Sequence, residues 1–266
     1  MPALEARGIE IAWTERGDGP PVLLIHETAA TGAVWDPLAE ALAGEFRAIA
    51  YDRRGWGAST APDDYRRTTV EEQSEDAAAL IEGVADGPAV VCGAGVGAVI
   101  GLDLLLRRSD LVSAAVLIEP HLFQLIPVAT EALSEDRQRL EIAAGNGENV
   151  IDVYLSGALR ALGPGVARTP ELTASVARER PASVVAELGI PAGWRMPLPR
   201  LASAARPSLV VTSGSTPPLV REASAALADR LAGSAAREVD SDGAAPHVGA
   251  AGEIARVLAG WLPGPR

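Results

Sequence analysis

Residues 91–98 read VCGAGVGA, a glycine-rich turn that joins two segments of different periodicity. The apolar stretch 88–92 is typical of a strand, and residues 96–107 have the spacing of a helix. A turn between a strand and a helix fits two known patterns. The pattern G-x-S-x-G holds a catalytic serine, and G-x-G-x-x-G/A holds the pyrophosphate of a dinucleotide. In the first pattern, Gly95 takes the position of the serine.

The segments on both sides of this turn alternate between strand and helix patterns. Short apolar runs such as 22–25 are typical of buried parallel strands, whereas 9–14 alternates as a strand with one solvent face. Such alternation predicts an α/β fold with a mostly parallel, doubly wound sheet that carries helices on both faces. The predicted strands are 9–14, 22–25, 46–51, 88–92, 114–118, 208–212 and 236–239, and the predicted helices are 34–42, 70–84, 96–108, 217–231 and 251–262.

One long segment interrupts this alternation. From residue 122 to about 205 the pattern is helical, with Gly/Pro breaks and no convincing strand. The sequence therefore predicts a core in two parts, 1–121 and 206–266, with a helical cap, 122–205, inserted between them. Helices are expected in the cap near 128–144, 148–161, 170–178 and 181–188.

Charge and composition exclude several classes of partner. The net charge of −12 over 266 residues opposes binding to nucleic acid and to anionic membranes, because both need a positive field. No apolar run approaches the roughly 20 residues that cross a bilayer, and the N-terminus lacks the layout of a signal peptide, so we expect a cytoplasmic protein. The three histidines have no metal-ligand spacing, and every basic residue is arginine, which removes Schiff-base chemistry. We expect no metal and no cofactor.

Three motifs in order along the chain resemble the α/β-hydrolase family. They are His26 at the end of a strand, the sequence DRRGWG from Asp52 after the next strand, and Gly93-Ala-Gly-Val-Gly97 at the turn. The resemblance covers the chain from about residue 9 to its end. It implies the α/β-hydrolase fold with a cap inserted after the sixth core strand, whereas function does not follow from the fold.

All three positions of the family's serine triad are vacant by the simplest alignment. Gly95 stands at the nucleophile position and has no side chain that could attack a substrate. The loop 213–218, where the resemblance places the acid, reads SGSTPP and contains no carboxylate. The histidine loop reads GAAPH, which puts Ala244 at the usual histidine and leaves His247 three residues further on.

The resemblance also implies which groups remain for chemistry. The backbone N–H groups of Glu27 and Val96 would form an oxyanion hole. Glu119 follows the sixth strand, where some family members carry their acid, and with His247 or His121 it would form a dyad that moves protons. The structural alternative is that Glu119 caps or pairs with an arginine and that both histidines only pack. The carboxylate of Glu27 either faces solvent or has gained a function.

Several other side chains have two interpretations. His26 either orders the oxyanion loop or transfers protons. Asp52 is expected to hold the loop that follows it, through Arg53 or Arg54, and Cys92 is expected to be a small buried hydrophobe. Large aromatic residues either line an apolar pocket under the cap or belong to the core, and these are Trp35, Trp56 and Trp194.

We therefore expect a protein that acts on a small, largely apolar, carbonyl-bearing molecule by non-covalent acid-base chemistry. One alternative is a hydrolase-like pocket that only binds a small ligand. The other is a dinucleotide site made by Gly93, Gly95 and Ala98, with Glu119 placed 26 residues after Gly93 for the ribose. Against the dinucleotide site, at least three strands precede the turn, whereas such a pattern normally opens its domain.

Overall fold

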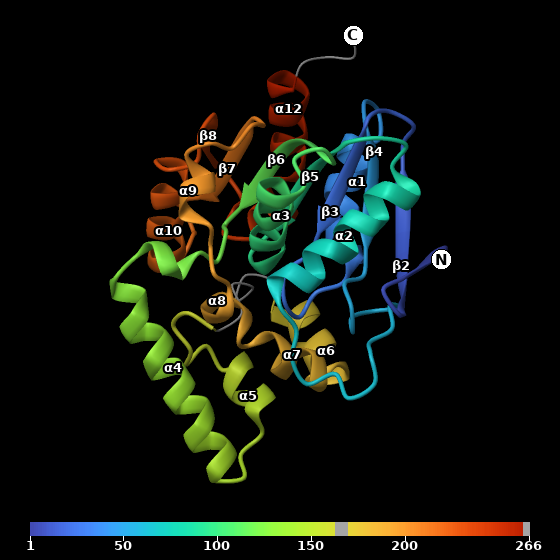
Figure 1. The fold of residues 1–266 in the computed structure, drawn as a ribbon. Helices are drawn as coiled ribbons and strands as arrows, with labels where there is room; N and C mark the ends of the chain where they lie inside the picture. Colours follow the sequence, from blue (N-terminus) through green and yellow to red (C-terminus); the bar gives the residue numbers. More distant parts are fainter. Residues whose placement is uncertain (163–169, 263–266) are drawn as a thin grey trace.

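The computed structural model describes residues 1–162 and 170–262, which form a central sheet with helices on both sides (Figure 1). Within this part of the chain, the strands pair in a single sheet of eight with the order β1-β2-β4-β3-β5-β6-β7-β8. Only the β1–β2 and β2–β4 pairs are antiparallel, so the predicted mostly parallel sheet is confirmed. The strands are β1 (Ala3–Ala6), β2 (Ile9–Arg16), β3 (Pro21–Ile25), β4 (Arg47–Tyr51), β5 (Ala89–Ala94), β6 (Val112–Ile118), β7 (Ser208–Ser213) and β8 (Ser234–Val239).

Alternate side chains of the strands enter two separate cores. In β5, Val91 packs into the core under α2, α3 and α10, while Val90 and Cys92 pack into the core under α1 and α12. Figure 1 shows α2 and α3 in front of the sheet and α12 behind it. Both faces are therefore covered, as the apolar strand runs predict. These helices are α1 (Asp36–Leu42), α2 (Val70–Val84), α3 (Val96–Arg107), α10 (Pro218–Ala228) and α12 (Ala251–Trp261); the short helix α11 (Pro246–Gly249) and the 3-10 turns η1 (Gly32–Trp35) and η2 (Phe123–Leu125) lie in loops.

A group of cap-like helices follows β6, as predicted. In Figure 1, α4 and α5 extend away from the sheet, and α6 and α7 lie near the ends of the central strands. Residues 163–169 of the predicted cap lie outside the described residues. Across residues 1–162 and 170–262, no helix has the length and apolar character needed to span a membrane. The cap helices are α4 (Val128–Gly145), α5 (Val150–Leu155), α6 (Pro170–Glu179), α7 (Pro181–Glu187), α8 (Ile190–Gly193) and α9 (Leu198–Leu201).

Some element boundaries differ from the sequence prediction. The edge strand β1 was not predicted, because its four residues are only partly buried and carry a weak pattern. The predicted helix 148–161 ends at Leu155. The buried carboxylate of Asp136 accepts the N–H groups of residues 160–162 at 2.6–2.9 Å, which holds that segment out of a helix.

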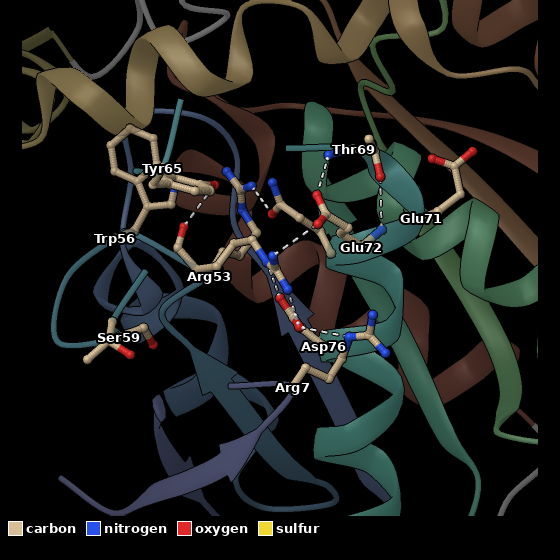
Figure 2. A network of polar contacts seen from close by, with 12 residues as sticks. Arg7, Arg53, Trp56, Ser59, Tyr65, Thr69, Glu71, Glu72 and Asp76 are labelled. Atoms are coloured by element: carbon tan, nitrogen blue, oxygen red, sulfur yellow. Dashed lines mark hydrogen bonds and ion pairs between the residues drawn. The ribbon is translucent and has the colours of Figure 1, made fainter. Parts of the chain in front are cut away.

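The start of α2 is closed by a capping box (Figure 2). The Thr69 hydroxyl accepts the N–H of Glu72 at 3.1 Å, and the Glu72 carboxylate accepts the N–H of Thr69 at 3.1 Å. One turn later, the carboxylate of Asp76 accepts two hydrogen bonds from Arg54, at 2.6 and 2.8 Å. Its Oδ1 also lies 3.8 Å from Nε of Arg7. The helix is therefore bonded to the loop after β4, which carries Arg53.

The glycines at 93 and 97 allow main chains to approach closely. A Cβ on Gly93 would overlap the carbonyl oxygen of Gly97, and a Cβ on Gly97 would overlap the carbonyl oxygen of Ile25. The helix α3 therefore packs directly against the main chain of β3 and β5. This packing accounts for the glycine pattern without a dinucleotide.

The strand order also fails to support the dinucleotide alternative. The glycine-rich turn follows β5, with β3 and β6 as the neighbours of that strand. Dinucleotide-binding sheets place this turn after their first strand, in the order 3-2-1-4-5-6. The turn therefore stands where the α/β-hydrolase resemblance puts the nucleophile.

We predict that Gly97→Ala destabilises the fold by about 1–3 kcal/mol. The new Cβ would overlap the backbone carbonyl oxygen of Ile25, which cannot move aside as a flexible side chain can. The matched control is Gly252→Ala. Both glycines are second residues of their helices, but a Cβ on Gly252 meets nothing within 4 Å. The control should change the free energy of unfolding by less than about 1 kcal/mol. Urea unfolding of both variants measures the difference, and equal midpoints would contradict the close approach of α3.

Candidate active site

The turn between β5 and α3 carries Gly95 in a backbone conformation that is unusual for other residues. Gly95 has φ 56° and ψ −117°, a conformation that glycine adopts more easily than any other residue. Its N–H donates to the carbonyl of Ile118 at 3.0 Å, and its carbonyl accepts the N–H of His121 at 3.4 Å. The backbone of the turn is therefore held by β6 and by the chain that follows it.

The space above Gly95 is occupied by the side chain of Glu27. A Cβ built on Gly95 would lie 3.1 Å from Glu27 Cβ and 3.4 Å from Glu27 Oε2. On another side, the same Cβ would lie 3.4 Å from Cε1 of His121. Glu27 is buried, so its carboxylate does not face solvent. The sequence left that question open, and the structure places this carboxylate at the elbow.

His247 is the imidazole that lies beside Glu27. Its Nε2 is 3.6 Å from Glu27 Oε1, and both side chains are buried. The ring also packs on Trp35, with centroids 4.8 Å apart. Trp35 comes from η1, and His247 comes from α11. The structure therefore brings the Glu27 carboxylate and the His247 imidazole together beside the elbow.

The side chain of Glu119 is hydrogen-bonded to Thr216. Its Oε1 accepts the hydroxyl hydrogen of Thr216 at 2.6 Å, and the same hydroxyl oxygen accepts the N–H of Ser213 at 2.8 Å. The backbone of Glu119 has φ 47°, which is strained for a residue with a side chain. Glu119 is therefore joined to the loop 213–218, and its pairing with a histidine stays a prediction.

His26 is bonded to the main chain through both ring nitrogens. Nε2 accepts the N–H of Arg53 at 3.0 Å, so Nδ1 carries the hydrogen and donates to the carbonyl of Glu27 at 2.7 Å. Burial, and then the charge of Arg53, hold the pKa of His26 well below its ordinary value. The ring of His26 is therefore neutral, and it connects the oxyanion loop to the loop after β4.

Asp52 orders the loop that follows it. Its carboxylate accepts the N–H of Gly32 at 2.7 Å and the N–H of Ala58 at 2.8 Å. The expected contact through Arg53 or Arg54 is not the one observed. Backbone N–H groups satisfy Asp52 instead, which leaves both arginines for other carboxylates.

Arg53 and Glu187 form a buried ion pair between the core and the cap helix α7. The guanidinium donates from NH1 to Oε1 at 2.6 Å and from NH2 to Oε2 at 3.0 Å, and the exposed fractions are 1% and 0%. Burial alone would raise the pKa of Glu187, but the charge of Arg53 and the hydrogen bonds that the carboxylate accepts hold it below the ordinary value. Sequence reasoning missed Glu187, because no local signal links residues 134 positions apart.

The remaining candidate side chains are buried. Cys92 is fully enclosed, and burial raises the pKa of its thiol, as expected for a structural residue. Trp56 packs with the cap in a small cluster that includes Tyr154, and Trp194 packs in the larger core and donates to Asp103 at 3.1 Å. Among the described residues, no three His, Cys, Asp or Glu side chains gather as a metal site would require.

Comparisons with known proteins agree with this architecture. A sequence model of the Alpha/beta hydrolase family matches residues 22–257. The chain is 36% identical over 123 residues to the uncharacterized hydrolase YraK of Bacillus subtilis, an alignment that covers 46% of this chain and 45% of the relative. It is 31% identical over 147 residues to a 2-(acetamidomethylene)succinate hydrolase of Mesorhizobium japonicum, which covers 54% of this chain and 50% of the relative.

The alignments thus span about half the length of these curated relatives. A solved structure shows the likeness over the whole chain. An alpha/beta hydrolase from Sphaerobacter thermophilus is 25% identical, with a TM-score of 0.72, and the match covers 98% of this chain and 100% of that one.

The lowered pKa of His26 predicts that the fold loses stability in mild acid. Below the ordinary histidine pKa of about 6.5, the unfolded chain binds a proton at His26 that the folded chain refuses, so a falling pH favours unfolding. Between pH 7.5 and 5.5 this single group should remove on the order of 1 kcal/mol. Urea unfolding at both pH values measures the loss, and His26→Gln should show a smaller one. An equal loss in the variant would contradict the assignment to His26.

Proposed function

Because the chain belongs to the alpha/beta hydrolase family, we propose that it hydrolyses a small, carbonyl-bearing molecule by acid-base chemistry, with water rather than a side chain as the nucleophile. The observation that carries the proposal is the pairing of buried His247 with buried Glu27, whose side chain lies over Gly95. Buried ionisable groups held together in this way are candidates for proton transfer.

In this mechanism, Glu27 orients His247 and stabilises its protonated form. The 3.6 Å separation of Nε2 and Oε1 is longer than a hydrogen bond, which is common before a substrate is bound. The imidazole takes a proton from a water molecule as the water oxygen attacks the carbonyl carbon. Carbon and water oxygen form the new bond, and the carbonyl oxygen becomes an oxyanion.

The oxyanion is stabilised by the N–H groups of Glu27 and Val96. Val96 is the first residue of α3, where a helix N–H has no partner within the helix. When the intermediate collapses, the bond to the leaving group breaks, and His121 on the other side of Gly95 delivers a proton to that group. No acyl-enzyme forms, because Gly95 has no side chain to carry one.

The same acid-base groups would also suit lyase-type or isomerising reactions. Relatives named as hydrolases support hydrolysis over those reactions. The burial of Glu27 beside His247 supports a carboxylate–histidine pair with the imidazole as general base, because a carboxylate gains nothing from burial at the elbow unless a partner stabilises it. A non-catalytic ligand-binding protein is the alternative, and the experiments below separate the two.

We predict that Glu27→Gln lowers kcat at least about 100-fold on any ester, lactone or thioester that the protein hydrolyses, because the paired carboxylate no longer supports the protonated imidazole. Glu119→Gln is the comparison variant and should lower kcat less than about tenfold, because its carboxylate contacts Thr216. Steady-state kinetics over a panel of those substrates measures both. A larger loss in Glu119→Gln would assign the acid to Glu119, and ligand binding without turnover over the whole panel would favour the binding protein.

We predict that a single turnover in H2 18O, with enzyme in excess over an ester or lactone substrate, places 18O in the carboxylic acid product. Water that attacks directly brings its own oxygen to the carbonyl carbon. A carboxylate that attacked first would expel the alcohol and form a mixed anhydride with the substrate acyl group. Water that opens this anhydride at its enzyme-side carbonyl would leave 18O in the carboxylate and an enzyme 16O in the product. Mass spectrometry of the product and of the peptide that contains Glu27 measures both fates, and 18O in Glu27 would contradict the general-base role.

A further inference from the structure

Glu187 receives more hydrogen bonds than its ion pair requires. Besides Arg53, its carboxylate accepts the indole N–H of Trp56 at 2.8 Å and the side-chain amide N–H of Gln73 at 3.1 Å. It also accepts the hydroxyl hydrogen of Thr28 at 2.7 Å. Glu187 is the last residue of α7, while its partners come from the core. One cap carboxylate therefore bonds to three separate core segments.

Two of these contacts lead to Glu27. Thr28 is the next residue in the chain, so its bond to Glu187 fixes one side of the Glu27 main chain. Arg53 is the start of the second path, because its N–H donates to His26 Nε2, and His26 Nδ1 donates to the carbonyl of Glu27. The main chain of Glu27 is thus held through Thr28 and through His26. Glu187 bonds to Thr28 directly and to Arg53, the residue that holds His26.

We propose that Glu187 is a positioning residue, and that docking of α7 on the core sets Glu27 above Gly95. When α7 leaves the core, Thr28 loses its acceptor, and the side chain of Arg53, whose backbone N–H holds His26, loses its counter-ion. The segment 26–29 then loses its direct support and the anchor of its indirect one. The kinetic consequence of this inference rests on the proposed function of Glu27. The mechanical consequence, a loosened segment, does not.

A second contact between cap and core offers a matched comparison. Trp194, directly after α8, donates its indole N–H to Asp103 on α3 at 3.1 Å. Within the described part of the chain, the other bonds that these two residues make, beyond the backbone bonds of their helices, go to Arg107 and Gln124, and not to the segment 26–29. Loss of that contact loosens the cap at another point. A structural role for the cap in general would make both losses equivalent, whereas positioning by Glu187 makes them different.

The test is hydrogen–deuterium exchange of the intact protein, without substrate, in three variants. Thr28→Val removes one hydroxyl at nearly constant shape, and Glu187→Gln removes the charge. Each should raise amide exchange in a peptide that covers residues 26–32 about tenfold, the factor for one hydrogen bond to a charged group. Trp194→Phe removes the indole N–H that Asp103 accepts, so it should raise exchange around α8 and leave residues 26–32 unchanged. Thr28→Val keeps the Arg53–Glu187 pair, so the test holds even where Glu187→Gln fails to fold.

Unchanged exchange at residues 26–32 in Thr28→Val would overturn the inference, and so would equal loosening of that segment in Trp194→Phe. Where a substrate is turned over, Thr28→Val should lower kcat about tenfold with KM within about twofold, and Thr28→Ser should restore kcat because it keeps the hydroxyl. Exchange needs no turnover, so it separates the two proposals. A loosened segment in a protein without activity leaves the positioning role in place and removes the proposed chemistry.

Discussion

The buried ion pair of Arg53 and Glu187 is the constraint on which the arrangement of cap and site depends. Removing two charges from water is expensive, and such a pair persists only when good geometry and further hydrogen bonds compensate. Here the carboxylate accepts five hydrogen bonds from Arg53, Trp56, Gln73 and Thr28. Loss of one charged partner leaves the other buried alone, which costs about 3–5 kcal/mol in proteins. A state in which α7 keeps only part of this contact is therefore unfavourable. The contact between α7 and the core is either fully formed or fully lost.

The elbow depends on a different constraint, which is the close approach of main chains. Gly93 and Gly97 allow α3 to contact β3 and β5, and these contacts remain whatever stands at position 95. The positive φ of Gly95 is set by bonds to Ile118 and His121. A glycine at that position relieves the strain that a side chain would feel there. The shape of the turn is thus a property of main-chain packing and hydrogen bonding.

The fold could be predicted from the sequence because its signals are local. Apolar runs and helical spacing identify most strands and helices, and the glycine-rich turn identifies the junction between β5 and α3. The site could be predicted only in part. His26, Glu27 and Gly95 lie next to recognisable strand ends, whereas the partner of His247 is 220 residues away and Glu187 has no local pattern. Chain folding alone brings these groups together, so periodicity cannot reveal them.

Gly95 and Glu27 are best understood as one physical change at the elbow. A side chain at position 95 would place its Cβ 3.1 Å from Glu27 Cβ, which is tighter than most real contacts, and a hydroxyl beyond it would enter the space that the carboxylate fills. A buried serine and a buried Glu27 therefore compete for the same volume. With glycine at position 95, the carboxylate gains both room and an imidazole partner in His247. The glycine at position 95 and the buried, paired carboxylate of Glu27 are therefore linked by the same limited space.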